Sequence, residues 1–273
     1  MVLAQLQAEF DREAKTFTDM LLQHYTGFSR IDLNLNPQRE MENVVVSQIQ
    51  EAVADLLKNK PIQYILGETE FCGLRVKVNP SVLIPRQETE ELAAWVAAEN
   101  PRAKNILDLC TGSGCIAVFL AHRLKNAALT AVDISPDALS VAKENAVLNN
   151  VSVDFQQDDI LRWDFYLPKK YDVIVGNPPY VRKMERQQMH ARVLNYEPQL
   201  ALFVDDDNPL QFYSAIACIG TKYLIGNGKL YLEINEAYGK EMADLLQKHN
   251  YKNIVLRKDI HEKKRMICGQ VTS

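Results

Sequence analysis

Residues 106–121 read ILDLCTGSGCIAVFLA: an apolar run, a group of small residues and a second apolar run. The first run is typical of a β-strand that is buried on both faces of a parallel sheet. The small residues at 111–114 allow the backbone to approach a ligand closely. The N-terminus of the helix that follows favours negative charge at the same point. Strand, glycine turn and helix in this order predict the ligand-binding edge of an α/β sheet.

Strands and helices alternate on both sides of this stretch. Strands are predicted at residues 105–109, 129–132, 151–155, 171–175, 229–234 and 253–257. Helices are predicted at residues 88–98, 116–124, 136–148, 210–224 and 240–249. Short buried strands that alternate with helices predict a mostly parallel sheet with helices on both faces.

The first 85 residues have a different pattern. Apolar residues recur at steps of three and four, which predicts a small helical bundle over residues 1–60. Short apolar alternations broken by Gly67, Gly73 and Pro80 predict a β-hairpin linker over residues 61–85. Residues 86–273 then form the α/β domain.

The composition limits the classes of protein to which the chain can belong. Of its 273 residues, 47% are hydrophobic and 24% charged, which is typical of a soluble globular protein. The formal net charge of −4 argues against a nucleic-acid partner held mainly by phosphate contacts. The five cysteines form no CxxC pair and no zinc-like cluster, so we expect reduced thiols and no metal. With no signal peptide and no apolar run near the roughly 18 residues of a membrane span, we expect a cytoplasmic, monomeric protein without a membrane partner.

Acidic residues follow the next two predicted strands. The segment LTAVDIS carries Asp133 at the end of its strand, where a carboxylate can accept both ribose hydroxyls of an adenosine. Asp158 and Asp159 follow the third strand, either near an adenine amino group or as solvated carboxylates at a helix start. Two alternatives remain for the glycine turn: it only packs a helix on a strand, or it is the dinucleotide fingerprint G-x-G-x-x-A at 112–117.

The segment NPPY at 177–180 indicates which chemistry the glycine turn serves. It follows the strand 171–175 and so lies at the same sheet edge. An amide or amino nitrogen is a poor nucleophile, since its lone pair is delocalised. Two rigid acceptors, the Asn177 side-chain oxygen and the Pro178 carbonyl, can hold both hydrogens of such a group and turn the lone pair outward. Tyr180 can pack against the planar group. This chemistry suits methyl transfer from the sulfonium of S-adenosylmethionine and does not suit hydride transfer; a purely structural strand exit is the remaining alternative.

These motifs together resemble the class I S-adenosylmethionine-dependent N-methyltransferases, which carry [DN]PP[YFW]. Within that class, the chain is similar to the release factor glutamine methyltransferases (the PrmC/HemK family). The resemblance covers most of the chain, from PIQYILGETEFCGLRVKVNPSVLIPRQETEEL (61–92) to NYEPQLAL, LYLEI and DIHEKKR further on. Its most specific part is LIPRQETE combined with YEP. It implies a Rossmann-like domain with a mostly parallel seven-stranded sheet. It also implies methylation of the amide nitrogen (N5) of the glutamine in the Gly-Gly-Gln motif of bacterial class-1 peptide chain release factors, a step of translation termination.

The resemblance also implies roles for individual residues. The methionine end of S-adenosylmethionine would be lined by Cys110, Thr111, Gly112, Ser113 and Gly114, with Asp133 at the ribose and Asp158 and Asp159 near the adenine. The glutamine would be bound by Asn177, Pro178, Pro179 and Tyr180, with Asn177 also facing the cofactor. The chain departs from the family at Gln87 (usually Pro), at Cys110 (usually Gly) and at Asp159, where relatives carry a tryptophan. A cysteine at positive φ would be strained.

Several residues outside these motifs have two interpretations. Arg86, Glu88 and Glu90 either shape the substrate entrance beside NPPY or belong to a capped helix with surface carboxylates. Glu197 in NYEP either gates or orients the incoming peptide loop or has no such role. The basic residues Arg182, Lys183, Arg186 and Arg192 form a solvated helix face or meet a release factor.

An adenine-N6 DNA or RNA methyltransferase is the alternative enzyme, but it would need a basic, aromatic-rich surface. A non-catalytic binding module would be expected to have lost Asn177 or the glycines.

Overall fold

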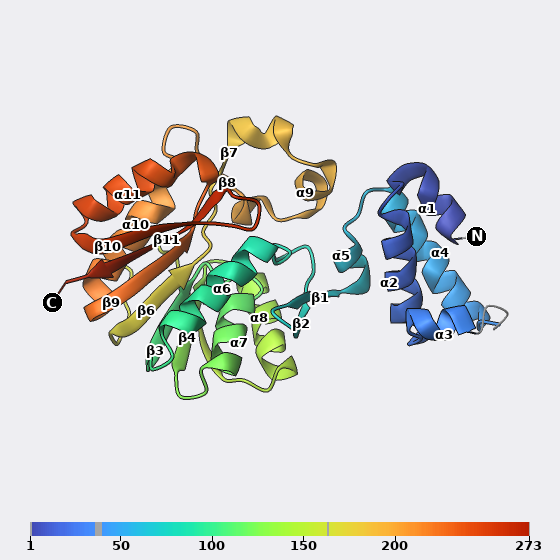
Figure 1. The fold of residues 1–273 in the computed structure, drawn as a ribbon, viewed down its shortest axis with the longest axis horizontal. Coiled ribbons are helices and arrows are strands. Elements are labelled where there is room, and N and C mark those ends of the chain that lie inside the picture. The colour runs from blue at the N-terminus through green and yellow to red at the C-terminus, as the bar shows by residue number, and fades with distance from the viewer. Residues whose placement is uncertain (1, 36–39, 163, 273) are drawn as a thin grey trace. The chain divides into compact units, whose positions relative to one another are not determined.

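The computed structural model of the chain describes residues 2–35, 40–162 and 164–272, and the chain divides into two compact units (Figure 1). The first unit contains the residues up to Gly67 together with His190–Tyr196, and the second contains Glu68–Met189 and the residues from Glu197 onward. Helix α5 (Ile62–Leu66) lies within the predicted linker and belongs to the first unit. No sequence pattern indicated that His190–Tyr196 would join the first unit.

The first unit is built from short helices around a small apolar core. Its helices are α1 (Val2–Phe10), α2 (Ala14–Thr26), α3 (Arg30–Leu35), α4 (Asn43–Leu57), α5 and α9 (Ala191–Tyr196). Arg192 of α9 places its guanidinium 4.9 Å from the ring centre of Phe10 and 5.2 Å from that of Phe17. The same guanidinium donates two hydrogen bonds of 3.2 Å to Glu13. Cation–π contacts and the ion pair thus fix α9 within this unit.

The second unit contains a seven-stranded sheet in the order β10-β11-β9-β6-β3-β4-β5. Its strands are β3 (Asn105–Leu109), β4 (Ala128–Asp133), β5 (Val153–Gln157), β6 (Tyr171–Gly176), β9 (Leu224–Glu233), β10 (Tyr251–Lys258) and β11 (Lys264–Val271). The strands from β9 to β5 pair in parallel, and β11 pairs antiparallel with both β9 and β10. This confirms the predicted mostly parallel seven-stranded α/β domain, although β11 itself was not predicted.

The helices of the second unit form two groups that cover the two faces of the sheet (Figure 1). One group contains α6 (Gln87–Glu99), α7 (Cys115–Arg123) and α8 (Pro136–Leu148), and the other contains α10 (Gln211–Tyr223) and α11 (Gly239–Lys248). Helix α8 begins where predicted, because Ser135 accepts a hydrogen bond from Ala138 N and Pro136 occupies the first turn. The core between the layers includes Leu107, Tyr171 and Tyr213, all fully buried.

The predicted hairpin is present as β1 (Glu68–Phe71) and β2 (Leu74–Lys77), and it packs on α8. The buried Asn145 of α8 accepts a hydrogen bond from Lys77 N at 2.6 Å and donates to Lys77 O at 3.0 Å. Asn145 also donates to Ser113 O at 2.9 Å, so one amide joins the hairpin to the glycine loop.

The remaining elements of the second unit are short. They are the strands β7 (Val181–Arg182) and β8 (Phe203–Val204) and the 3-10 helices Lys183–Gln188, Gln199–Ala201 and Glu236–Tyr238. Across the described residues of both units, the helices fall short of the length and apolar character that a membrane crossing requires.

Candidate active site

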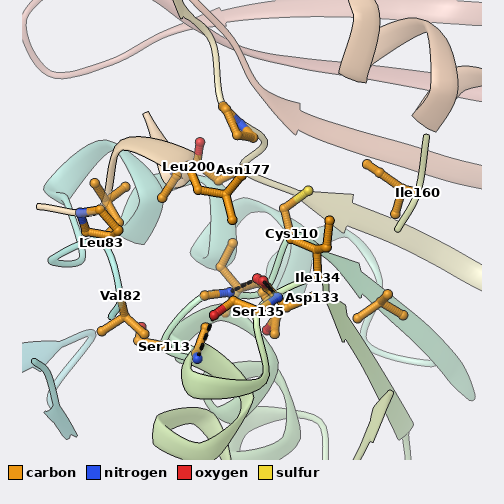
Figure 2. Close-up of a pocket in the computed structure, with 18 of the residues that line it drawn as sticks. Val82, Leu83, Cys110, Ser113, Asp133, Ile134, Ser135, Ile160, Asn177 and Leu200 are labelled. Atoms are coloured by element: carbon orange, nitrogen blue, oxygen red, sulfur yellow. Dashed lines mark hydrogen bonds between the residues drawn. The ribbon is translucent and has the colours of Figure 1, made fainter. Parts of the chain in front are cut away.

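A cavity of about 230 Å³ lies where β3, β4 and β6 reach the carboxyl edge of the sheet (Figure 2). Its lining includes nine of the residues predicted from the sequence: Cys110, Thr111, Gly112, Ser113, Asp133, Asp158, Asp159, Asn177 and Pro179. The other predicted residues, Gly114, Pro178, Tyr180, Arg86 and Glu197, lie outside this lining. The carboxyl edge thus brings the two predicted motifs to one cavity, as expected for a parallel sheet.

The turn between β3 and α7 has a left-handed backbone at three positions. Gly112 and Gly114 have φ of 54° and 77°, and Cys110 has φ of 60°. A Cβ at Gly114 would lie 2.8 Å from Ala142 Cβ, so only glycine allows α7 to pack this closely on α8. Cys110 carries the strain expected of a side chain at positive φ, which explains why a glycine suits this position.

Asp133 at the end of β4 holds the glycine turn through backbone groups. Its Oδ2 accepts a hydrogen bond from Gly112 N at 2.8 Å, and its Oδ1 accepts one from Ser135 N at 2.9 Å (Figure 2). Burial raises the pKa of Asp133, and these backbone donors oppose the rise by stabilising the ionised form. Since each carboxylate oxygen can accept more than one hydrogen bond, the group can also bind two neighbouring hydroxyls.

Asp108 supports the glycine turn from below, and the sequence analysis did not identify it. It lies fully buried in β3 beneath the turn, and the Thr111 hydroxyl donates to its Oδ2 at 2.6 Å. Within the described part of the chain, its Oδ1 has no hydrogen-bond partner. Burial raises the pKa of Asp108 to about 7. The available signal was a carboxylate in the middle of an otherwise apolar strand.

Asp158 and Asp159 both face the cavity, and both also bind backbone. Asp158 accepts a hydrogen bond from Asp159 N at 2.8 Å, and Asp159 accepts one from Leu161 N at 2.9 Å. Both side chains are half-buried. They therefore close the turn after β5 and leave carboxylate oxygens at the cavity wall, so an adenine contact remains a prediction.

The segment NPPY follows Gly176, which pairs with Leu109 of β3. A Cβ at Gly176 would lie 2.7 Å from Leu109 O, so the residue before Asn177 must be glycine. The Asn177 side-chain nitrogen donates to Thr89 Oγ1 at 3.2 Å. Thr89, in the first turn of α6, lines the same cavity and was not predicted.

Tyr180 turns its hydroxyl away from the cavity. The hydroxyl donates to Glu233 Oε1 at 2.9 Å, and the ring packs against the hydrophobic core. Burial raises the pKa of Tyr180 well above its ordinary value. The hydrogen bond to Glu233 therefore holds Tyr180 in place. Tyr180 is not among the residues that line this cavity, and its packing against the substrate stays a prediction.

Arg86 and Glu197 form an ion pair with each other. Glu197 is 5% exposed, and its other oxygen accepts a hydrogen bond from Ile84 N at 3.1 Å. The pair joins two segments that both line the cavity, residues 81–85 and residues 198–201. A direct role in binding substrate remains a prediction for both residues.

The basic residues after NPPY are engaged within their own units. Arg182 pairs with Glu185, Lys183 with Asp205, and Arg186 stacks over the Phe203 ring at 5.7 Å. Arg192 is held within the first unit, as described above. No group of three or more potential metal ligands occurs among the residues with a described position.

The chain resembles known methyltransferases in both fold and sequence. The structure matches a methyltransferase from Pyrococcus furiosus with a TM-score of 0.56 at 17% identity, covering 82% of this chain and 100% of that one. Residues 89–200 match the family "Methyltransferase small domain". This range includes the glycine turn and NPPY. The second unit is therefore a Rossmann-like methyltransferase domain.

Closer relatives define the family. Residues 2–67 match the "PrmC N-terminal domain". The chain is 46% identical to the release factor glutamine methyltransferase of Flavobacterium psychrophilum, over 94% of this chain and 92% of that protein. It is 45% identical to the protein of the same name from Bacteroides thetaiotaomicron, over 88% of this chain and 83% of that one. The chain belongs to the release factor glutamine methyltransferase family, as its motifs predicted.

Proposed function

We propose that this chain transfers a methyl group from S-adenosylmethionine to the side-chain amide nitrogen (N5) of the glutamine in the Gly-Gly-Gln motif of bacterial class-1 peptide chain release factors. The observation that carries this proposal is that Asn177 and Asp133 line one cavity in a chain of this family. The family supports the protein substrate, and the geometry supports a planar amide next to an adenosine cofactor.

The residues at the cavity fit S-adenosylmethionine. The Asp133 carboxylate, already fixed by Gly112 N and Ser135 N, would bind the ribose hydroxyls. The small residues of the turn, from Cys110 to Gly114, would line the methionine end. Apolar side chains at the wall, such as Ile134 and Ile160, would pack on the adenine, beside the Asp158 and Asp159 carboxylates. When bound, S-adenosylmethionine supplies an electrophilic methyl group on a sulfonium.

On the substrate side, the residues of NPPY would hold the glutamine amide. The Asn177 oxygen and the Pro178 carbonyl accept the two amide hydrogens and so turn the nitrogen lone pair toward the methyl group. Their rigid placement lowers the barrier through orientation and needs no catalytic base. After transfer the amide nitrogen loses one proton, which passes to water.

The helical first unit would recognise the folded release factor and so bring its Gly-Gly-Gln loop to the cavity. The protein would act as a monomer in the cytoplasm, with no direct contact to nucleic acid. The ion pairs of the basic side chains after NPPY support the absence of a nucleic-acid contact, because they leave little free positive charge for a phosphate backbone.

The test uses the purified full-length chain and S-adenosylmethionine labelled on its methyl group. It is offered a release factor, the same release factor with alanine in place of the motif glutamine, and, separately, DNA and RNA. We expect label in the first release factor alone. Label in nucleic acid and not in the release factor would instead support the adenine-N6 alternative and overturn the proposal.

A further inference from the structure

Three hydrogen bonds connect the cavity with a carboxylate in the core of the second unit. Asn177 Nδ2 donates to Thr89 Oγ1 at 3.2 Å, and Thr89 Oγ1 donates to Glu233 Oε2 at 2.6 Å. The Tyr180 hydroxyl donates to Glu233 Oε1 at 2.9 Å. Thr89 is 3% exposed and Glu233 1% exposed, so water does not compete for these contacts.

The sheet register brings these residues together from distant parts of the chain. Gly176 of β6 pairs with Leu232 of β9. The next residues of the two strands, Asn177 and Glu233, therefore lie side by side at the same edge of the sheet. Thr89 enters from the first turn of α6 and lies between them. The partners Thr89 and Glu233 are 144 residues apart in the sequence.

The direction of these hydrogen bonds decides which atom Asn177 offers to a substrate. An ionised carboxylate can only accept, so the single Thr89 hydroxyl proton points to Glu233. The Thr89 oxygen must then accept from Asn177, and it can accept only from the amide nitrogen. Among the residues with a described position, none donates a hydrogen bond to Asn177 Oδ1. The amide oxygen is thereby left as an acceptor.

Glu233 has no evident purpose in stability alone. No lysine or arginine of the described chain forms an ion pair with it, and its hydrogen-bond partners are two hydroxyls. Burial raises the pKa of Glu233, while the Thr89 and Tyr180 hydrogen bonds and the nearby charge of Arg265 lower it. Burying a carboxylate in this way is costly, and an apolar residue of similar size would fill the space at less cost.

We propose that Glu233 is a positioning residue: through Thr89 it fixes the Asn177 amide with its oxygen free to accept from the substrate amide, and it braces Tyr180 at the other end of NPPY. This inference rests on the proposed function, because it assigns the acceptor of that reaction. Glu233 and Thr89 act through Asn177 and take no proton from the substrate.

The test compares Thr89→Val with Thr89→Ser in the full-length chain. Valine keeps the shape of threonine and removes the hydroxyl, whereas serine keeps the hydroxyl. We expect Thr89→Val to lower kcat for release factor methylation about tenfold to a hundredfold, because the amide is no longer held in one orientation. Thr89→Ser should keep most of the wild-type kcat. The Kd for S-adenosylhomocysteine should stay close to wild type in both variants. The thermal midpoint should stay close to wild type in Thr89→Ser and fall in Thr89→Val, because the buried Glu233 Oε2 then loses its donor.

Glu233→Gln supplies an independent measurement, because Glu233 accepts the last of the hydrogen bonds that lead from Asn177 through Thr89. A glutamine amide can donate to Thr89, and the reversed chain would turn the Asn177 nitrogen to the substrate. We expect a fall in kcat, smaller than that of Thr89→Val, because one of the two glutamine orientations keeps the native direction.

Wild-type kcat in both Thr89→Val and Glu233→Gln would overturn the positioning role. A rise in the Kd for S-adenosylhomocysteine that matches the fall in kcat would also overturn it, since the substitutions would then disturb the cavity as a whole. Absence of transfer by the wild-type chain would instead contradict the proposed function, so the two failures are distinguishable.

Discussion

The cavity has a proposed cofactor side at Asp133 and a proposed substrate side at Asn177, and different kinds of atoms hold the two sides in place. On the cofactor side, the Asp133 carboxylate is bound by the backbone N–H groups of Gly112 and Ser135. On the substrate side, Asn177 is bound by the Thr89 side chain, which in turn is bound by the Glu233 side chain. Backbone donors persist when side chains change, provided that the turn keeps its shape. The substrate side depends on individual side chains, so single substitutions there should affect catalysis more selectively.

The same contrast appears in sequence separation. The cofactor-side contacts join residues on consecutive strands and turns, whereas the substrate-side contacts join α6, β6 and β9. A local motif can specify the first kind of site, and only the complete sheet can assemble the second. The following substitutions test this difference, beginning with the largest expected effect.

Asn177→Ala should separate catalysis from cofactor binding most clearly. It removes the proposed acceptor for the glutamine amide, so we expect kcat to fall at least about a hundredfold. The Kd for S-adenosylhomocysteine should change little, because Asp133 and the glycine turn remain. Single-turnover kinetics and calorimetry measure the two quantities. A variant with normal turnover would remove Asn177 from the reaction.

Asp133→Asn should have the opposite signature. An asparagine cannot accept from both Gly112 N and Ser135 N with separate oxygens, because one oxygen is replaced by a donor. Asparagine also leaves one of the ribose hydroxyls without a charged acceptor. Losing a hydrogen bond to a charged group costs about 1.5–3 kcal/mol, so we expect the Kd for S-adenosylhomocysteine to rise about tenfold to a hundredfold. The kcat at saturating cofactor should fall less. An unchanged Kd would show that the carboxylate does not hold the cofactor.

Asp108→Asn should change the pH dependence of stability. Burial raises the pKa of Asp108 in the folded chain to about 7, above its ordinary value of 3.8. Between these two pH values the folded state keeps a proton that the unfolded state has lost, so the contribution of Asp108 to the free energy of unfolding falls as pH rises. Asparagine does not titrate, and it can still accept from Thr111.

We therefore expect the stability of Asp108→Asn relative to wild type to increase between about pH 5 and about pH 8, by on the order of 1–3 kcal/mol. Urea denaturation at the two pH values measures this difference. A difference that does not depend on pH would mean that the Asp108 carboxyl ionises normally.

Cys110→Gly and Cys110→Ala test the smallest effect, the strain in the cofactor-side turn. Cys110 has φ of 60°. This conformation is strained for alanine as it is for cysteine, whereas glycine adopts it freely. We expect the glycine variant to be about 1 kcal/mol more stable than the alanine variant in urea denaturation. Both should keep the cofactor affinity, because neither substitution changes Asp133 or its hydrogen bonds with Gly112 N and Ser135 N. Equal stability of the two variants would show that the turn is not strained at this position.

Much of the second unit could be predicted from local sequence. The strand 105–109 and the helix 136–148 coincide with β3 and α8, because one is apolar at Ile106, Leu107 and Leu109 and the other has a serine cap and a proline start. The region after α10 was predicted less well. Strand β9 begins at Leu224, directly after the helix, and its pairing with β6 is irregular near its start. Strand β11 begins with Lys264 and Arg265, so its polar first residues hid its antiparallel pairing.

The candidate site divides in the same way. The glycine turn, Asp133 and NPPY were predicted because each follows an apolar strand at a known edge of the sheet. Thr89 and Glu233 were not predicted as site residues, because their importance comes from hydrogen bonds between α6 and β9 that leave no local pattern. Arg86 and Glu197 were identified from the sequence, but their mutual ion pair became evident only in the fold.

The most direct test of the account locates the transferred methyl group on the substrate. The full-length chain is incubated with S-adenosylmethionine and a class-1 release factor, and the digested product is examined by tandem mass spectrometry, with Asn177→Ala as the control. The account predicts one added methyl group on the side-chain nitrogen of the Gly-Gly-Gln glutamine, and none with the control. A methyl group on another residue, or equal methylation by the control, would contradict it.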